Sequence, residues 1–144
     1  MKQIVFIIFI VAFAPTAASD TVSLSDTGYS VEKELVARIY HKEIAEAESM
    51  PSLSGAPSIA IASIDLNRDG KNEIIANIRH SYWCGSHGCK LVILTPKPNG
   101  IWDEIASLIS YGEIEVSNDY VNGYKTIVLD KGNKIWTFIN GEYQ

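Results

Sequence analysis

The sequence has few cysteines, few basic residues, few histidines and no long apolar run, and each of these shortages argues against a class of protein. With only two cysteines, Cys84 and Cys89, a single disulfide pairing is possible. The 12 lysine and arginine residues are outnumbered by 17 aspartate and glutamate residues, and this acidic balance argues against nucleic acid as a partner. The apolar run at residues 4–14 is shorter than the roughly 20 residues of a membrane span. The three histidines lie at unrelated positions, and no nucleophile stands in a recognisable elbow, so we expect no enzyme.

The first 18 residues have the layout of a secretory signal peptide. Lys2 precedes the apolar run, and small residues follow it through Ala18. Cleavage after Ala18 leaves 144 − 18 = 126 residues, and the loss of Lys2 changes the formal charge from −5 to −6. We therefore expect a periplasmic or secreted protein without a membrane span. Its predicted parts are a signal peptide at 1–18, a flexible mature N-terminus at 19–29 and a single domain at 30–144.

The hydrophobic pattern changes once along the mature chain. From residue 30 to 48, apolar side chains recur with a helical period and form one wide face. After a connection rich in proline, strand-sized apolar segments follow, separated by turn pairs such as Asn122-Gly123. These segments are 58–64, 73–79, 91–95, 101–108, 113–117, 124–130 and 134–139. We predict an α+β fold in which one N-terminal helix packs on a curved antiparallel meander of about seven strands.

An acidic turn follows the first predicted strand. Asp65, Asn67 and Asp69 alternate along it, as oxygen ligands do at the start of a calcium loop, and Gly70 permits the sharp turn. A helix-loop-helix calcium site also needs a glutamate at loop position 12, where this chain has Ala76. The flanking residues also have the period of strands. Both observations exclude an EF-hand.

The same turn resembles the strand-loop-strand calcium turn of FG-GAP and related β-propeller repeats, which places a carboxylate at the ninth loop position. The chain has one copy, so the resemblance implies a local device and no propeller. The implied ligands of a structural calcium ion are the Lys71 carbonyl and the side chains of Asp65, Asn67, Asp69 and Glu73. The alternative is a hairpin without metal, in which the two aspartates cap backbone amides as Asx turns.

The two cysteines enclose a short turn that contains a histidine between glycines. In an exported chain they are expected to form a disulfide. A ring this short stabilises the protein by only about 2 kcal/mol, so its main effect is to make the loop rigid. We predict that the loop inserts into the groove of a protein partner, because a preorganised loop loses less entropy on binding. The predicted partner-binding residues are Tyr82, Trp83, Ser86 and His87.

Three other interpretations of this loop stay open. In the first, the disulfide is purely structural and only closes a hairpin. Alternatively, two histidines and two cysteines, His80, Cys84, His87 and Cys89, complete a tetrahedral zinc site. In the last interpretation, one cysteine is a nucleophile activated by a histidine base. The zinc site and the catalytic cysteine both require free thiolates, whereas a structural disulfide does not.

The spacing Cys-x-x-His-x-Cys between two strands resembles the loop of the bacterial periplasmic inhibitor of vertebrate lysozyme. In that family a disulfide-closed loop offers its histidine to the catalytic carboxylates of the enzyme. The resemblance implies that Cys84 and Cys89 clamp the loop and that His87 enters the active-site cleft. It also implies a lysozyme-like hydrolase as the partner.

A broader resemblance covers most of the mature chain. The DxNxDG turn, the CGxxGC loop and the endings Asn122-Gly123-Tyr124, Trp136-Thr137-Phe138 and Asn140-Gly141-Glu142-Tyr143 resemble a class of small exported bacterial proteins. This resemblance implies no particular function. Taken together, the residues predict a non-enzymatic protein-binding domain that acts as an inhibitor or immunity protein against a cell-wall hydrolase. The alternative is a calcium-stabilised structural or scaffolding domain of the envelope.

Overall fold

The computed structural model describes residues 19–50 and 55–144, so the predicted signal peptide at 1–18 lies outside the described residues. Two short helices and ten strands form within these ranges. The helices are α1 (Ser30–Ile39) and α2 (His41–Glu48). The strands are β1 (Ser19–Val22), β2 (Ser58–Ile64), β3 (Glu73–Arg79), β4 (Cys89–Pro96), β5 (Trp102–Ser110), β6 (Ile114–Val121), β7 (Tyr124–Leu129), β8 (Lys134–Trp136), β9 (Phe138–Ile139) and β10 (Glu142–Tyr143).

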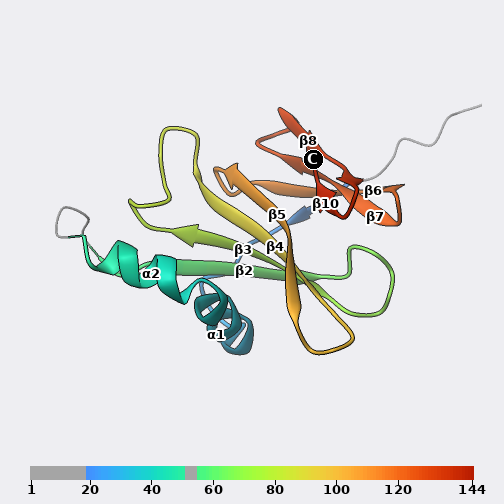
Figure 1. Cartoon of the computed structure of the whole chain (residues 1–144). Helices are drawn as coiled ribbons and strands as arrows, with labels where there is room; N and C mark the ends of the chain where they lie inside the picture. Colours follow the sequence, from blue (N-terminus) through green and yellow to red (C-terminus); the bar gives the residue numbers. More distant parts are fainter. Residues whose placement is uncertain (1–18, 51–54) are drawn as a thin grey trace, which may run out of the picture.

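The described strands form three antiparallel sheets. The central sheet has the order β2-β3-β4-β5, the second sheet has the order β1-β6-β7-β8, and β9 pairs with β10 alone. Figure 1 shows α1 and α2 on one side of the central sheet and the second sheet on its other side. The central sheet is therefore the middle layer of the molecule.

The composition of β3 explains why the central sheet is covered on both faces. Successive side chains of a strand point to opposite faces, and both Ile74 and Ile75 of β3 are buried. Ile74 packs in a cluster with Val36 of α1 and with Tyr40 between the helices. Ile75 packs in a separate cluster that includes Ile127 of the second sheet. Each face of the central sheet thus has a hydrophobic core of its own.

The predicted fold, one helix on a curved sheet of about seven strands, is wrong. Of the residues that the structure describes, 48% lie in strands and 15% in helices, and the ten strands form three sheets. The single helix expected at 30–48 is interrupted at Tyr40, whose φ of −99° and ψ of 21° are not helical. The meander ends after β5, because the chain from Ile114 onward crosses to the second apolar face of the central sheet.

The first described residues belong to the second sheet. β1 lies within 19–29, where we expected no regular structure, and its Ser19 pairs with Ser117 of β6. Farther along, Ser25 forms an isolated antiparallel bridge with Ile61 of β2. The segment before α1 is thereby attached to both four-stranded sheets.

Candidate functional site

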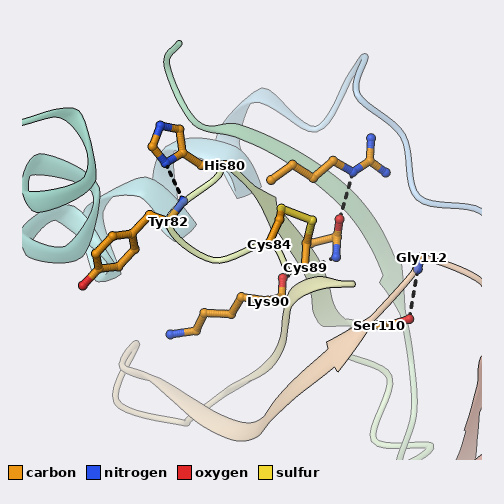
Figure 2. The surroundings of a disulfide bond; sticks show 9 residues. His80, Tyr82, Cys84, Cys89, Lys90, Ser110 and Gly112 are labelled. Atoms are coloured by element: carbon orange, nitrogen blue, oxygen red, sulfur yellow. Dashed lines mark hydrogen bonds between the residues drawn. A yellow bond between two sulfur atoms is a disulfide. The ribbon is translucent and has the colours of Figure 1, made fainter. Parts of the chain in front are cut away.

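The loop between β3 and β4 ends in a tight hairpin closed by a disulfide. The backbones of Gly85 and Gly88 exchange hydrogen bonds of 2.8 and 3.2 Å, which leaves Ser86 and His87 as the central residues of the turn. Gly88 has a φ of +109°, the left-handed conformation that glycine adopts readily. Just outside this turn, Cys84 and Cys89 are bonded, with their Cα atoms 4.0 Å apart (Figure 2). The predicted disulfide is therefore confirmed.

The hairpin is also attached to the end of β5 and to the residue after it. Gly88 is buried against Ser110, and a Cβ atom added to this glycine would lie 2.3 Å from the Ser110 carbonyl carbon. The hydroxyl group of Tyr111 donates a hydrogen bond to the carbonyl oxygen of Ser86. The turn therefore has two attachments to the central sheet besides the disulfide.

The base of the loop is held from the other side, next to the helices. His80 is only 7% exposed, and its Nδ1 accepts a hydrogen bond of 3.1 Å from the backbone N–H of Tyr82. Its Nε2 therefore carries the hydrogen and donates to the Gly55 carbonyl oxygen at 3.0 Å. Burial and the nearby Glu46 carboxylate of α2 raise the pKa of Tyr82. In Figure 2 the Tyr82 side chain points away from the disulfide.

The structure brings the four predicted partner-binding residues to one place, with different roles. They line a shallow cavity of about 350 Å³ together with Cys84 and Ile109. Ser86 and His87 are exposed at the tip, and the Ser86 Oγ lies 3.0 Å from the His87 Nδ1. Trp83 instead packs partly against the core beneath the helices, and its ring meets that of Tyr82 edge-on at 5.0 Å. The tip is thus exposed, while Trp83 packs on the core and Tyr82 packs against Trp83.

Two exposed residues beside the tip were missed in the sequence. Ile109 is 42% exposed and Tyr111 is 67% exposed, although both are large and partly apolar. The register of β4 and β5 shifts between Ile93 and Leu94, where β5 has one extra residue. A bulge of this kind reverses the alternation of inward and outward side chains. The sequence pattern of β5 alone could not therefore assign Ile109 to the surface, and the only signal for Tyr111 is its place beside Gly112.

The disulfide decides between the interpretations of the cysteine loop that involve free thiols. There are no free cysteines in the described residues, and both cysteines of the chain lie there. Neither sulfur is a thiolate that could bind zinc or attack a substrate. The bond also indicates an oxidising compartment. None of the described helices is long and apolar enough to cross a membrane.

The aspartate side chains of the acidic turn accept hydrogen bonds from backbone N–H groups. Asp65 accepts hydrogen bonds from the N–H groups of Asn67, Arg68 and Gly70 at 3.2, 2.7 and 3.0 Å. Asp69 accepts one from Lys71 at 2.8 Å. Desolvation raises the pKa of Asp65, but the backbone hydrogen bonds outweigh it and leave the pKa below its usual value. These contacts are the Asx turns that we considered as the alternative to calcium.

Glu73 joins this turn to the central sheet. It is fully buried, and one carboxylate oxygen accepts from the Leu66 N–H at 2.7 Å. The other accepts from the Thr95 hydroxyl at 2.9 Å and from the Asn67 amide nitrogen at 3.2 Å. Desolvation raises the pKa of Glu73, and the Asp69 charge adds to the rise. The carboxylate is thus satisfied by three donors, two from the acidic turn and one from β4.

The side chains of this turn are engaged in hydrogen bonds with one another. Asn67 turns its amide nitrogen toward both Asp69 and Glu73, whereas a metal ligand would present its oxygen. No group of three or more histidine, cysteine, aspartate or glutamate side chains that could hold a metal ion occurs in residues 19–50 and 55–144. Calcium binding through Asp65, Asn67, Asp69, Lys71 and Glu73 stays a prediction of the sequence pattern.

No protein-family model, curated protein or solved structure matches this chain. The resemblances to the lysozyme inhibitor, to the FG-GAP calcium turn and to the class of small exported proteins rest on sequence motifs alone. They therefore stay predictions.

Proposed function

We propose that this chain is an exported, non-enzymatic domain that binds another protein with the tip of its disulfide-closed hairpin. The observation that supports this most is the contrast between the tip and its surroundings. Ser86 and His87 are exposed, while the disulfide, the Tyr111 hydroxyl and the close contact of Gly88 hold the turn from several sides. A side chain presented on a rigid loop loses little conformational entropy when it is bound.

The chemistry of His87 supports a cleft lined by carboxylates as the binding site on the partner. When Ser86 donates its hydroxyl hydrogen to the His87 Nδ1, the Nε2 of the ring carries a hydrogen and is free to donate it. Most glycoside hydrolases act through a pair of carboxyl groups in a cleft. A lysozyme-like cell-wall hydrolase is therefore the partner that we propose, with this chain as its inhibitor or immunity protein.

The test is inhibition of lysozyme-type muramidases by the mature protein. We expect inhibition by the native chain, a large loss in His87→Ala and a partial loss when both cysteines are replaced by alanine. Direct binding by surface plasmon resonance should follow the same order. A matched control is His41→Ala, because His41 is also exposed but lies on α2, where its Nδ1 is 3.0 Å from the Arg38 carbonyl oxygen.

Two results would reject this proposal. Inhibition that survives both His87→Ala and the loss of the disulfide would show that the loop is not the contact surface. Absence of both inhibition and binding with every muramidase would remove the hydrolase as a partner. Circular dichroism of each variant would show that loss of activity is not loss of folding.

A calcium-stabilised structural domain of the envelope is the second candidate. The observation that favours it is the burial of the Glu73 carboxylate in the same turn as the Asp69 carboxylate: desolvation raises the pKa of Glu73, and the Asp69 charge adds to the rise. A nearby cation would relieve this repulsion. Absence of inhibition combined with calcium-dependent melting would support this candidate over the first.

A further inference from the structure

A second cavity, of about 630 Å³, lies far along the sheet from the hairpin and shares no lining residue with the cavity at its tip. It is bounded by α1, by the residues around the turn from β2 to β3 and by the start of β5. Its volume falls within the range of about 300–1,000 Å³ that is usual for small-molecule sites. It is therefore large enough to hold a ligand.

One wall of this cavity is apolar and includes an aromatic ring. Ile74 of β3 is buried there, and Leu35 and Trp102 are half-buried in the same core cluster. Trp102 is the first residue of β5 and pairs with Pro96 at the edge of the central sheet. A partly exposed indole at such a place offers a flat apolar surface to a ligand.

The polar side chains around the cavity are not paired with other side chains among the described residues. They are the side chains of Glu32, Glu34, Arg38, Ser63 and Asn72. None of the ion pairs between described residues includes Glu32, Glu34 or Arg38. Where Arg38 does accept a hydrogen bond, it does so through its backbone carbonyl oxygen. Carboxylate, guanidinium, hydroxyl and amide groups are thus all available to a ligand at one site.

We propose that this cavity binds a neutral polyhydroxylated ligand, a sugar ring or a short glycan. Two carboxylates beside one guanidinium disfavour an anion, and the guanidinium disfavours a cation. Hydroxyl groups both donate and accept, so they can bond to carboxylate, amide and guanidinium groups alike. The apolar face of a sugar ring would pack against Trp102, as ligands pack on aromatic walls in concave sites. This inference does not depend on the proposed function of the hairpin.

The test is titration of the mature protein with chitotriose and, separately, with cellotriose, followed by tryptophan fluorescence and by isothermal titration calorimetry. We expect saturable binding of at least one trisaccharide, with a dissociation constant of about 1 mM or tighter. Trp102→Ala should weaken it at least tenfold. Arg38→Ala and Asn72→Ala test the exposed polar rim without altering the core, and each should weaken binding several-fold.

Controls keep this test separate from the test of the hairpin. Trp83→Ala removes a half-buried tryptophan of the same core cluster but lines only the cavity at the tip, so sugar affinity should be unchanged. His87→Ala should also leave it unchanged. The proposal would be overturned by no saturable binding of either sugar, by equal affinity in Trp102→Ala and Arg38→Ala, or by tighter binding of tetramethylammonium than of both sugars.

Discussion

The hydroxyl group of Tyr111 donates a hydrogen bond to the carbonyl oxygen of Ser86, although the two residues are 25 positions apart in the chain. Tyr111 immediately follows β5, the last strand of the central sheet. The tip of the β3–β4 hairpin is thereby tied to a different strand from the two that form it. The disulfide joins Cys84 to Cys89, whereas this hydrogen bond joins the tip to the residue after β5 and adds to the contact of Gly88 with Ser110.

Tyr111→Phe is expected to loosen the tip without unfolding the domain. Loss of one hydrogen bond at an exposed site should lower the free energy of unfolding by at most about 1.5 kcal/mol. Hydrogen exchange at the Gly85 and Gly88 amides should become faster, and binding through His87 should weaken. Tyr29→Phe is the control, because Tyr29 is exposed at the start of α1, away from the hairpin. Unchanged exchange rates in Tyr111→Phe would show that the hydrogen bond does not hold the tip.

Gly88→Ala is expected to destabilise the domain by about 2–4 kcal/mol. The added methyl group would meet the Ser110 backbone at 2.3 Å, and the φ of +109° is unfavourable for alanine. Gly85→Ala is a matched control, because Gly85 and Gly88 hydrogen-bond to each other across the turn, but a Cβ added to Gly85 would have no atom within 4 Å. Chemical denaturation of both variants measures the difference. Equal stability of the two would contradict the close contact at Ser110.

The strands could be predicted from the sequence far better than their pairing. Segments 58–64 and 73–79 coincide with β2 and β3, because apolar runs bounded by turn residues are local signals. The pairing depends on which buried face each strand must cover. Ile74 and Ile75 lie on opposite faces of the central sheet, and both faces are buried. Nothing in their local sequence shows that the strands from Ile114 onward cover one of these faces. The error in the fold class came from this non-local step.

The same limit applies to the candidate sites. The disulfide and the exposure of His87 follow from a short, contiguous motif. The support from Tyr111 does not, because it depends on where β5 ends beside the hairpin. In the acidic turn, the spacing of oxygen atoms can be read from the sequence, but the orientation of the Asn67 amide cannot. That orientation is set by the Asp69 N–H, which donates to the Asn67 side-chain oxygen at 3.0 Å.

Calcium is expected to raise the melting temperature of the mature domain slightly, as the resemblance of the acidic turn predicts. To offer oxygen to a cation, Asn67 must give up the hydrogen bonds from its amide nitrogen to Asp69 and Glu73. Asn67→Asp has no such nitrogen and adds a carboxylate, so its calcium-dependent rise should be larger. Calorimetry in chelator and in millimolar calcium measures both. The control is Asn118→Asp, an exposed position on β6, and an unchanged melt in native and Asn67→Asp proteins would reject the calcium site.

The carboxylates of Glu73 and Asp65 should affect the free energy of unfolding in opposite directions as the pH changes. Desolvation holds the pKa of Glu73 above its unfolded value, so its contribution is present below the unfolded pKa of about 4.3 and is lost as the pH rises through the folded value. Backbone hydrogen bonds outweigh desolvation at Asp65 and hold its pKa below the unfolded value of about 3.9. Its contribution is present above that value and is lost as the pH falls through the folded pKa.

Asp65→Asn tests the contribution of the Asp65 carboxylate by itself. The amide keeps one acceptor oxygen in place of two, so it loses part of the bonding to Asn67, Arg68 and Gly70. At pH 7 we expect a loss of about 1–2 kcal/mol in the free energy of unfolding. The difference from the native protein should begin to shrink below about pH 4, where the unfolded carboxylate is protonated, and should reach its minimum once the pH has fallen through the lower folded pKa of Asp65. Urea denaturation at several pH values measures it, with Asp20→Asn on β1 as the control. A difference that stays constant from pH 7 to pH 2 would show that the Asp65 charge does not stabilise the turn.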